Sequence, residues 1–256
     1  MTAFVVGCSV GSVALPRSPA DRTQSLFARH PPQLIKPSGI ALDHHLPPHL
    51  PIRIARHAGR SGAATSRPVT RVQILRGAED GIHIDSVHWG WAPFGAREKR
   101  PDPINARVET VTTGKFFKQL WPHGRALVPD NGWFEWVKDP VDPKKKQPYF
   151  IRQKSQEPMF FAARARVTPG TEPQEGDGFV IITADSAGGM VDIHDRRPVV
   201  LAPDLARKWL DPSTPMERAE QVALRQSEPA DTFEWFKVDR GVGNVRNQGS
   251  ELIRPK

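Results

Sequence analysis

The stretch Asn131-Gly132-Trp133-Phe134-Glu135-Trp136 decides how the rest of the chain is interpreted. An Asn-Gly pair is typical of a tight turn, and the aromatic residues that follow favour a β-strand. Because side chains alternate along a strand, Trp133 and Glu135 would share one face, and Phe134 and Trp136 the other. The sequence therefore predicts a carboxylate set among large aromatic side chains.

Two interpretations of Glu135 follow from this pattern. Burial of an unpaired carboxylate is costly, so a buried Glu135 would be paired or would stay protonated, as in sites that move a proton near neutral pH. Alternatively, Glu135 points to solvent from an edge strand between two core tryptophans, or belongs to a structural ion pair. The pattern alone leaves both open.

Alternating or apolar stretches on both sides of this segment predict further strands, and helices are fewer. Strands are expected at 72–75, 82–87, 124–129, 148–151, 158–163, 179–183, 199–201 and 233–238, the first two joined as a hairpin. Helices are expected at 106–120 and 203–210, with Asn105 at the head of the first as a cap or a ligand contact. The pattern therefore predicts a β-rich fold.

Composition divides the chain of 256 residues near residue 68. Residues 1–68 contain no Trp or Tyr and carry five of the nine His. Their net charge is +6, whereas residues 69–256 carry +2 of the total +8. We therefore expect a disordered or mistranslated segment at 1–68 and one folded domain at 69–256. The pI of about 9.9 suggests a polyanionic partner, but the folded part needs local charge clusters to bind one.

Several classes of protein are excluded by the residue types. The single cysteine, Cys8, permits no internal disulfide and no cysteine zinc site, and fits a reducing cytosol. No run of 18 apolar residues is present, so no membrane partner is expected. No metal and no organic cofactor is predicted, and the expected location is the cytoplasm, with the nucleoid as the DNA-bound site.

Two more segments carry candidate site residues. Trp89 and Trp91 flank Gly90 ahead of Pro93, which predicts a rigid aromatic loop, either a corner of the core or a platform for DNA bases. A second segment contains His194, bracketed by Asp192 and Asp195 and followed by two arginines. A carboxylate neighbour would hold one His194 tautomer, and the arginines would attract phosphate. Together with Asn105 and Glu135, His194 suits aldehyde, imine or acyl chemistry.

The order and spacing of five motifs resemble the SOS response-associated peptidase (SRAP) family of abasic-site processing proteins. The resemblance covers about residues 72–255 and rests on Trp89-Gly90 with Pro93, Ile104-Asn105-Ala106-Arg107, Gly132-Trp133-Phe134-Glu135-Trp136, Ile193-His194-Asp195-Arg196-Arg197-Pro198 and Asn244-Val245-Arg246-Asn247. It implies an α+β fold in which antiparallel sheets form a barrel-like core with a few peripheral helices. It also implies a monomer that binds single-stranded DNA, or junctions with duplex, at abasic sites.

The chemistry that the resemblance implies is a covalent DNA–protein crosslink. In the family an N-terminal Cys closes a thiazolidine with the sugar aldehyde and is credited with self-cleavage of a leader, so the expected enzyme is a peptidase-type hydrolase with lyase-like crosslinking. The implied catalytic residues are Asn105, which orients the sugar, Glu135, which shuttles protons, and His194, which assists ring opening and reversal. The implied DNA-binding residues are Arg107, Arg197, Trp89 and Trp91.

The N-terminus departs from the family pattern. The family begins Met-Cys-Gly-Arg, whereas this chain begins Met1-Thr2-Ala3, and Cys8 follows Gly7. Where the family has Asn-Val-Ala-Pro, this chain has Thr-Ser-Arg-Pro at 65–68, a change that a one-nucleotide frame shift can produce. We hypothesise that residues 1–68 are an out-of-frame translation, and peptides from that segment with an unbroken gene sequence would refute it.

Two other functions remain open at this point. Without the N-terminal Cys, the chain would be a non-catalytic DNA-binding remnant that binds abasic DNA reversibly. Without regard to the family, Glu135 and His194 could be the acid and base of a small hydrolase, which sustained turnover of esters or amides would reveal.

Overall fold

The computed structural model describes residues 71–93, 102–121, 124–142, 144–168, 174, 176–244, 247 and 249–256. It also gives the backbone of three short strands, β1 (Val5–Cys8), β2 (Ile52–Ile54) and β3 (Ala64–Ser66). Apart from these strands, the expectation that residues 1–68 are disordered or mistranslated lies outside the described residues.

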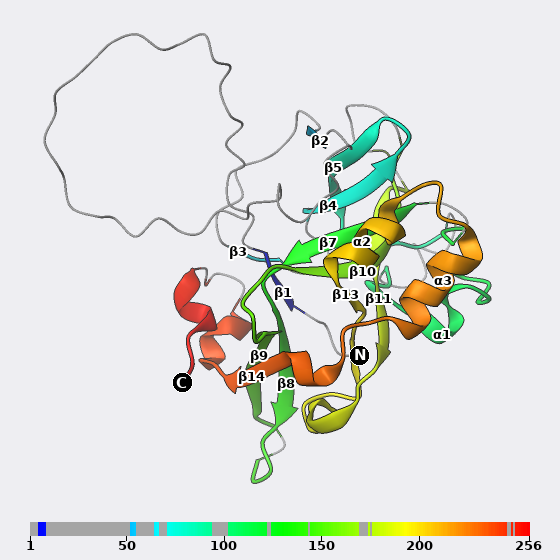
Figure 1. The fold of residues 1–256 in the computed structure, drawn as a ribbon. Coiled ribbons are helices and arrows are strands. Elements are labelled where there is room, and N and C mark those ends of the chain that lie inside the picture. The colour runs from blue at the N-terminus through cyan, green and yellow to red at the C-terminus, as the bar shows by residue number, and fades with distance from the viewer. Residues whose placement is uncertain are drawn as a thin grey trace, which may run out of the picture.

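The strands form two sheets (Figure 1). The smaller sheet runs β14 (Phe233–Lys237), β9 (Lys146–Gln153), β8 (Trp133–Lys138), β1 and β3. The larger sheet runs β12 (Arg196–Pro198), β11 (Gly178–Asp185), β10 (Met159–Arg166), β7 (Arg125–Asp130), β4 (Arg71–Ala78), β5 (Gly81–His88) and β2. Two further strands join it, β13 (Val200–Leu201) on β10 and β6 (Asn105–Arg107) on β11. Only β6–β11 and β2–β5 pair in parallel among the described strands.

Helices are few, as the sequence predicts, and they are short. They are α1 (Val108–Val111), α2 (Pro203–Leu210) and α3 (Met216–Arg225); in Figure 1 α2 lies over β7 and β10, with α3 and α1 to its right. Four 3-10 turns complete the described elements: η3 (Gly188–Asp192), η4 (Ala230–Thr232), η5 (Arg240–Gly243) and η6 (Ser250–Ile253). The fold is therefore a mixed α/β fold of sheets with few helices. No helix in the described part of the chain has the length and apolar character needed to cross a bilayer.

The predicted helix at 106–120 is wrong for most of its length. Asn105 pairs with Ile181, so residues 105–107 form β6 on the edge of β11, and only Val108–Val111 are helical. A backbone ladder with β11 outweighs local helix propensity there, and two β-branched threonines and Gly114 follow α1 and end it. Asn105 is consequently not a helix cap, since Arg107 occupies that position without a side-chain capping bond.

The barrel-like core remains a prediction. Trp89, the residue that directly follows β5, makes an isolated parallel bridge with Phe179 near the start of β11. β5 itself pairs with β4 on one side and with β2 on the other, and only the residue that follows it reaches β11, through this single bridge. Among the described residues this bridge is the nearest approach to closure, and no continuous ladder closes a barrel.

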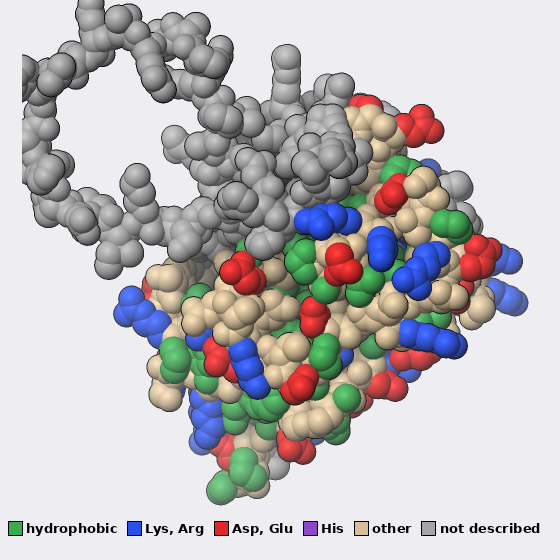
Figure 2. Space-filling view, viewed as in Figure 1, with side chains coloured by type: hydrophobic (Ala, Val, Ile, Leu, Met, Phe, Trp, Pro, Cys, Tyr) green, Lys and Arg blue, Asp and Glu red, His purple; other side chains and the backbone are tan. Residues whose placement is uncertain are grey.

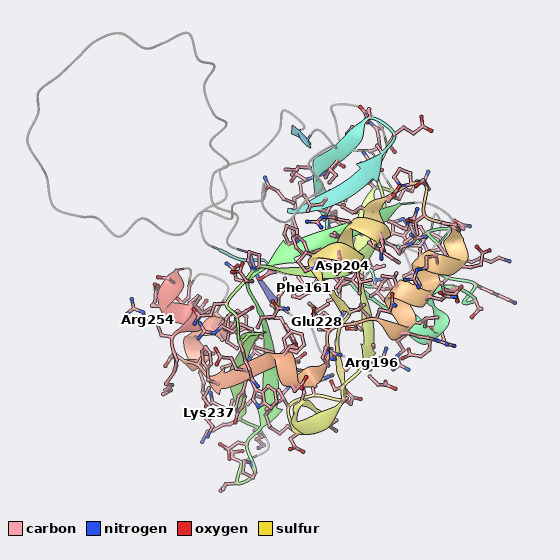
Figure 3. The ribbon with its side chains drawn as sticks, in the orientation of Figure 1. Phe161, Arg196, Asp204, Glu228, Lys237 and Arg254 are labelled. Atoms are coloured by element: carbon pink, nitrogen blue, oxygen red, sulfur yellow. The ribbon has the colours of Figure 1, made fainter. Side chains whose placement is uncertain are left out.

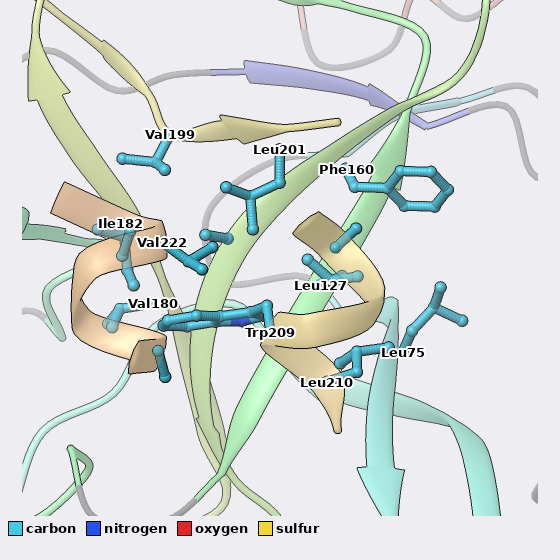
Figure 4. Close-up of a cluster of buried hydrophobic side chains, with 14 of the residues drawn as sticks. Leu75, Leu127, Phe160, Val180, Ile182, Val199, Leu201, Trp209, Leu210 and Val222 are labelled. Atoms are coloured by element: carbon cyan, nitrogen blue, oxygen red, sulfur yellow. The ribbon is translucent and has the colours of Figure 1, made fainter. Parts of the chain in front are cut away.

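The larger sheet is buried on both faces. Consecutive residues of β10 show this. Phe160 packs in a cluster with Trp209 of α2 and Val222 of α3 (Figure 4), whereas Phe161 packs in a second cluster with Trp133. Both phenylalanines are at most 2% exposed. Burial on both faces explains why strands of this sheet, such as residues 179–183, read as continuous apolar runs rather than as alternating ones.

Arg164 on β10 is a charged residue buried within this largely apolar interior. It is 1% exposed, and none of its three guanidinium nitrogens has a hydrogen-bond partner. Its guanidinium carbon lies 4.5 Å from the ring centre of Trp121 and 5.5 Å from that of Trp209. Desolvation, followed by the charge of Arg125, lowers the pKa of Arg164 to about 9.

We expect Arg164→Met to raise the free energy of unfolding by about 1–3 kcal/mol. An unpaired buried charge costs several kcal/mol, and two cation–π contacts of about 1–2 kcal/mol each offset only part of that cost. Urea unfolding at pH 7 measures the difference. Arg164→Lys is the matched control and should lower stability, because an ammonium keeps the charge and loses the planar contact. A loss of stability in Arg164→Met as large as in Arg164→Lys would contradict this account.

Candidate functional site

The turn between β7 and β8 sets the position of the central strand. The Asp130 carboxylate accepts a hydrogen bond of 3.0 Å from the backbone N–H of Gly132, an arrangement typical of a side chain that closes its own turn. β8 then pairs with β9 so that Glu135 lies opposite Tyr149. A Cβ on Gly132 would lie 2.2 Å from the Phe150 ring, so only glycine allows β8 to approach β9 this closely.

Glu135 is buried, as the first of the two interpretations required. It is 1% exposed, and neither carboxylate oxygen has a hydrogen-bond partner. Desolvation and then the charge of Asp195 raise the pKa of Glu135 to about 9, with an opposing contribution from the nearby Trp133 side chain. The Trp133 indole N–H itself has no partner at hydrogen-bond geometry. Glu135 is therefore a protonated acid at neutral pH, able to donate a proton.

Asp130, at the end of β7 and five residues before Glu135, is a second buried acid, and the sequence analysis did not single it out. It is 1% exposed, and burial raises its pKa well above the usual range despite the backbone N–H groups of Gly132 and Asn131. Its other carboxylate oxygen has no hydrogen-bond partner. An acid two residues before the glycine of an Asn-Gly turn was the available signal.

His194 lies between η3 and β12, and its Nδ1 is held by neighbouring groups. Nδ1 is 3.0 Å from both the backbone N and the backbone O of Arg196, and 3.0 Å from a carboxylate oxygen of Asp195. The side chain is 19% exposed. Asp195 is thus the carboxylate neighbour that the sequence predicted. When Nδ1 donates to one of the oxygens, Nε2 is the basic nitrogen of the ring.

Asn105 and Arg107 lie on β6. The side-chain oxygen of Asn105 is buried without a hydrogen-bond partner. Such an acceptor is costly to leave unpaired and commonly marks a functional position. Arg107 is exposed at the end of the strand, where its charge acts on Glu109.

Arg196 ties these segments together. Its guanidinium donates to both carboxylate oxygens of Glu109 at 2.9 and 3.0 Å, to the Thr183 carbonyl at 2.7 Å, and to Asp185. Figure 3 labels Arg196 among the side chains of the molecule. Glu109 is in α1, directly after β6, and the backbone of Arg196 contacts His194. The sequence predicted arginines that attract phosphate here, but the guanidinium of Arg196 is occupied by carboxylates.

The three catalytic candidates come from separate elements that meet at one apolar cluster. Ile104, Trp133 and Ile193 all pack in the cluster around Phe161. Each lies one or two residues from Asn105, Glu135 or His194. The charge of Asp195, beside His194, also acts on Glu135. The fold therefore gathers these residues around one cluster, although they are far apart in the sequence.

Trp89 and Trp91 are core residues, so the proposed base-stacking platform is wrong for the structure described. Trp89 is 0% exposed and Trp91 is 1% exposed. The Trp89 indole donates to the Ile104 carbonyl at 3.0 Å and stacks on Phe179 with ring centres 6.2 Å apart. The interpretation as a corner of the core is the one that the burial supports, and Trp89 thereby anchors the segment that carries Asn105.

Arg197 is likewise not offered to a phosphate. It is 6% exposed, it donates to the Glu228 carbonyl at 2.6 Å, and it lies 5.5 Å from the ring centre of Phe233. Desolvation lowers its pKa, an effect that Glu228 opposes. Of the predicted DNA-contacting residues, Arg107 alone presents an exposed side chain.

No group of three or more His, Cys, Asp or Glu in the described residues is arranged to hold a metal ion.

Comparison with known proteins gives consistent matches. Residues 56–245 match the family model described as SOS response associated peptidase (SRAP). The chain is 47% identical over 188 residues to the abasic site processing protein YedK of Escherichia coli, covering 73% of this chain and 82% of that protein. It is 30% identical over 184 residues to the abasic site processing protein YoaM of Bacillus subtilis, covering 70% and 80%.

Solved structures share the fold. A phage-related protein from Bordetella bronchiseptica is 38% identical with a TM-score of 0.60, covering 73% of this chain and 87% of that one. A protein from Bacteroides thetaiotaomicron at 22% identity, also with a TM-score of 0.60 and covering 73% and 82%, supports the fold alone.

Proposed function

Because the chain belongs to the SOS response associated peptidase (SRAP) family, we propose that it processes abasic sites in single-stranded DNA by forming a covalent crosslink with the sugar aldehyde. The observation that carries this proposal is the protonated, buried Glu135 beside the cluster shared with Asn105 and His194. A site of this kind supplies protons to a carbonyl in a place that excludes water.

Each residue has a role in the proposed reaction. His194 assists ring opening, in which a proton leaves the anomeric hydroxyl and another reaches the ring oxygen. The α-amine of an N-terminal Cys then adds to the aldehyde carbon, and Glu135 protonates the resulting hydroxyl so that water leaves and an imine forms. The thiol of that Cys adds to the imine carbon and closes a thiazolidine. Asn105 orients the sugar with its free side-chain oxygen, and Arg107 binds a flanking phosphate.

The register of β1 argues against Cys8 as the nucleophile. Val5 pairs with Phe134, the residue next to Glu135, and Val6 pairs with Trp133. The backbone of Cys8 pairs with Ala64 instead. At about 3.3 Å per residue, the three residues from Val5 to Cys8 carry Cys8 roughly 10 Å along the strand from Val5. This favours the family's N-terminal Cys over Cys8 as the attacking residue.

One experiment tests the proposed function. The full chain, and a version in which a Met-Cys-Gly-Arg start replaces residues 1–68, are each incubated with single-stranded DNA that contains one abasic site. Denaturing gels and intact mass spectrometry detect the crosslink, and the mass of the N-terminus reports self-cleavage. We expect a crosslink in the version with the family start.

The other outcomes identify the alternative. A crosslink of the full chain that maps to Cys8 would contradict the argument from the β1 register. No crosslink in either version, with reversible binding of abasic DNA retained, would support a non-catalytic DNA-binding protein.

We expect His194→Ala to slow crosslink formation and its reversal by about 10- to 100-fold, since one general acid–base group contributes at least that much. The affinity for unmodified DNA should change less than twofold. Single-turnover crosslinking at saturating DNA measures the rate in the version that reacts. His83→Ala is the matched control, because His83 lies on β5 and contacts Asp80 at 2.7 Å, away from the cluster. An equal loss of strand affinity in His194→Ala would argue against a role in the chemistry.

A further inference from the structure

The surface has a hollow that lies away from the cluster around Glu135. Its volume is about 510 Å³, and it opens where the ends of β4, β7 and β10 meet the C-terminal end of α2. Its lining is formed by Arg76, Gly77, Trp91, Gln119, Leu120, Gly124, Arg125, Ala165, Arg166, Val167, Leu210 and Pro212. None of these lining residues is acidic. We call this hollow the arginine pocket.

Strand geometry concentrates positive charge on one side of the pocket. Arg125 on β7 pairs with Arg164 on β10, and Arg166 lies two residues further on the same face as Arg164. The charge of Arg125 contributes to the lowered pKa of Arg164, as expected for two guanidinium groups that repel each other. Asp211 is the acid whose charge acts on Arg125.

The arginines differ in how much of their charge is already used. Arg125 donates to the carbonyls of Asp211, Pro212 and Thr214 at 2.7 to 3.3 Å, so it stabilises the negative end of α2. Arg76 is paired with Asp85 at 3.0 Å. The buried Arg164, which does not line the pocket, has no hydrogen-bond partner, and Arg166 is exposed with no ion pair to any described residue.

The rest of this side of the molecule does not supply a broad basic surface. In the view of Figure 2, Lys and Arg side chains over α2 and α3 are interspersed with Asp and Glu. The +2 net charge of residues 69–256 agrees with that mixture. The arginine pocket is therefore a local excess of positive charge in a hollow, which attracts an anion more strongly than a scattered surface does.

We propose that the arginine pocket binds a phosphate group carried by a nucleotide unit. Arg166 supplies the bidentate fork that suits a phosphate, and the exposed amide of Gln119 adds a donor. The walls formed by Leu120, Leu210 and Pro212 give the sugar an apolar contact. A hollow of this volume is within the range of small-ligand sites. The nucleotide unit belongs to a DNA strand or is a free mononucleotide, and both offer the same chemistry.

The test uses the full chain and DNA without an abasic site, so its outcome is independent of crosslinking. The proposal depends on the proposed function only because it assumes that the polymer bound by the protein is DNA. Arg166→Ala is compared with Arg225→Ala, a matched control because Arg225 is equally exposed on α3, outside the pocket. Fluorescence anisotropy measures binding of a labelled single strand across a salt series. Thermal shift assays and NMR titration with deoxyadenosine monophosphate, and with deoxyadenosine as the phosphate-free probe, measure nucleotide binding.

Loss of one phosphate contact should lower the slope of log affinity against log salt by about 0.7 for a single strand, and weaken binding about threefold at low salt. We expect this change in Arg166→Ala and none in Arg225→Ala. If the nucleotide binds the wild-type chain and deoxyadenosine does not, a free mononucleotide is also a ligand; if only the strand responds, the source is DNA. Equal salt slopes for Arg166→Ala and the wild-type chain, together with no phosphate-dependent nucleotide binding, overturn the proposal.

Discussion

Glu135→Gln is expected to slow crosslinking to an abasic strand by about 100- to 1,000-fold, because a neutral amide cannot replace a protonated carboxyl as the acid. The shape of the side chain is retained, so the affinity for unmodified DNA should change less than threefold. The single-turnover crosslinking rate at saturating DNA measures this loss, in whichever of the two versions, the full chain or the one with the Met-Cys-Gly-Arg start, forms the crosslink. Retention of the wild-type rate would remove Glu135 from the mechanism.

The same substitution should stabilise the fold, and the effect should grow with pH. The pKa of Glu135 is raised from 4.5 to about 9, so the unfolded chain releases this proton above pH 4.5 whereas the folded chain keeps it until about pH 9. Stability therefore falls with rising pH in that window by about 1.4 kcal/mol per unit, an upper bound for this group. Glu135→Gln removes the penalty, which is about 3 kcal/mol at pH 7.

Urea unfolding at pH 5 and pH 8 tests that sign. The gain in Glu135→Gln should be small at pH 5 and larger at pH 8. Glu79→Gln, an exposed residue in the turn between β4 and β5, serves as the control and should show no such trend. Parallel stability curves for the wild-type chain and Glu135→Gln would mean that Glu135 is ionised in the folded protein. A residue that lowers stability and raises reactivity is expected at a catalytic position.

Gly132→Ala should cost about 3 kcal/mol of unfolding free energy, at the upper end of the usual range for overpacking. A Cβ there would lie 2.2 Å from Cζ of Phe150 and 2.5 Å from the carbonyl oxygen of Ile151. The carbonyl belongs to β9 and cannot move without shifting the ladder that pairs Glu135 with Tyr149. A displaced Glu135 would also lower the crosslinking rate, since misplacement by about 1 Å can cost 100-fold.

Gly243→Ala is the matched control for this substitution. Nothing lies within 4 Å of a Cβ built on Gly243, so its stability should remain within about 0.5 kcal/mol of wild type. Urea unfolding of both variants gives the comparison. If Gly132→Ala proved as stable as Gly243→Ala, the close approach of β8 to β9 would not determine where Glu135 lies.

The sequence predicted most strands because their signals are local. The hairpin of β4 and β5 follows from alternation and a Gly-containing turn, and the buried strand at 179–183 follows from its apolar run. Helix α3 was missed, although Ala219, Val222 and Ala223 lie on one buried face at helical spacing. The helix expected at 106–120 failed because the edge of β11, distant in sequence, recruits β6.

The candidate site was predictable only in part. Burial of Glu135 could be expected from the aromatic residues around it in β8. The contacts of Arg196 with Glu109 join residues 87 apart, so no local pattern reveals them. The burial of Trp89 and Trp91 could not be predicted either, because an aromatic loop has the same composition whether it faces DNA or the core. Only the packing of the folded chain shows that both side chains are in the core.

Burial of the larger sheet on both faces also affects how the protein behaves once it unfolds. Residues 160–163 of β10 and 179–183 of β11 contain no charged side chain, and such segments associate readily when they are exposed. Pro158 and Arg164 flank the first of these segments and Asp177 and Asp185 the second, as the nearest residues that interrupt association. We therefore expect heating to end in aggregation, with an apparent Tm that depends on scan rate and protein concentration. Wild-type and variant chains are best compared in urea, where the exposed segments stay dissolved and unfolding can be reversed.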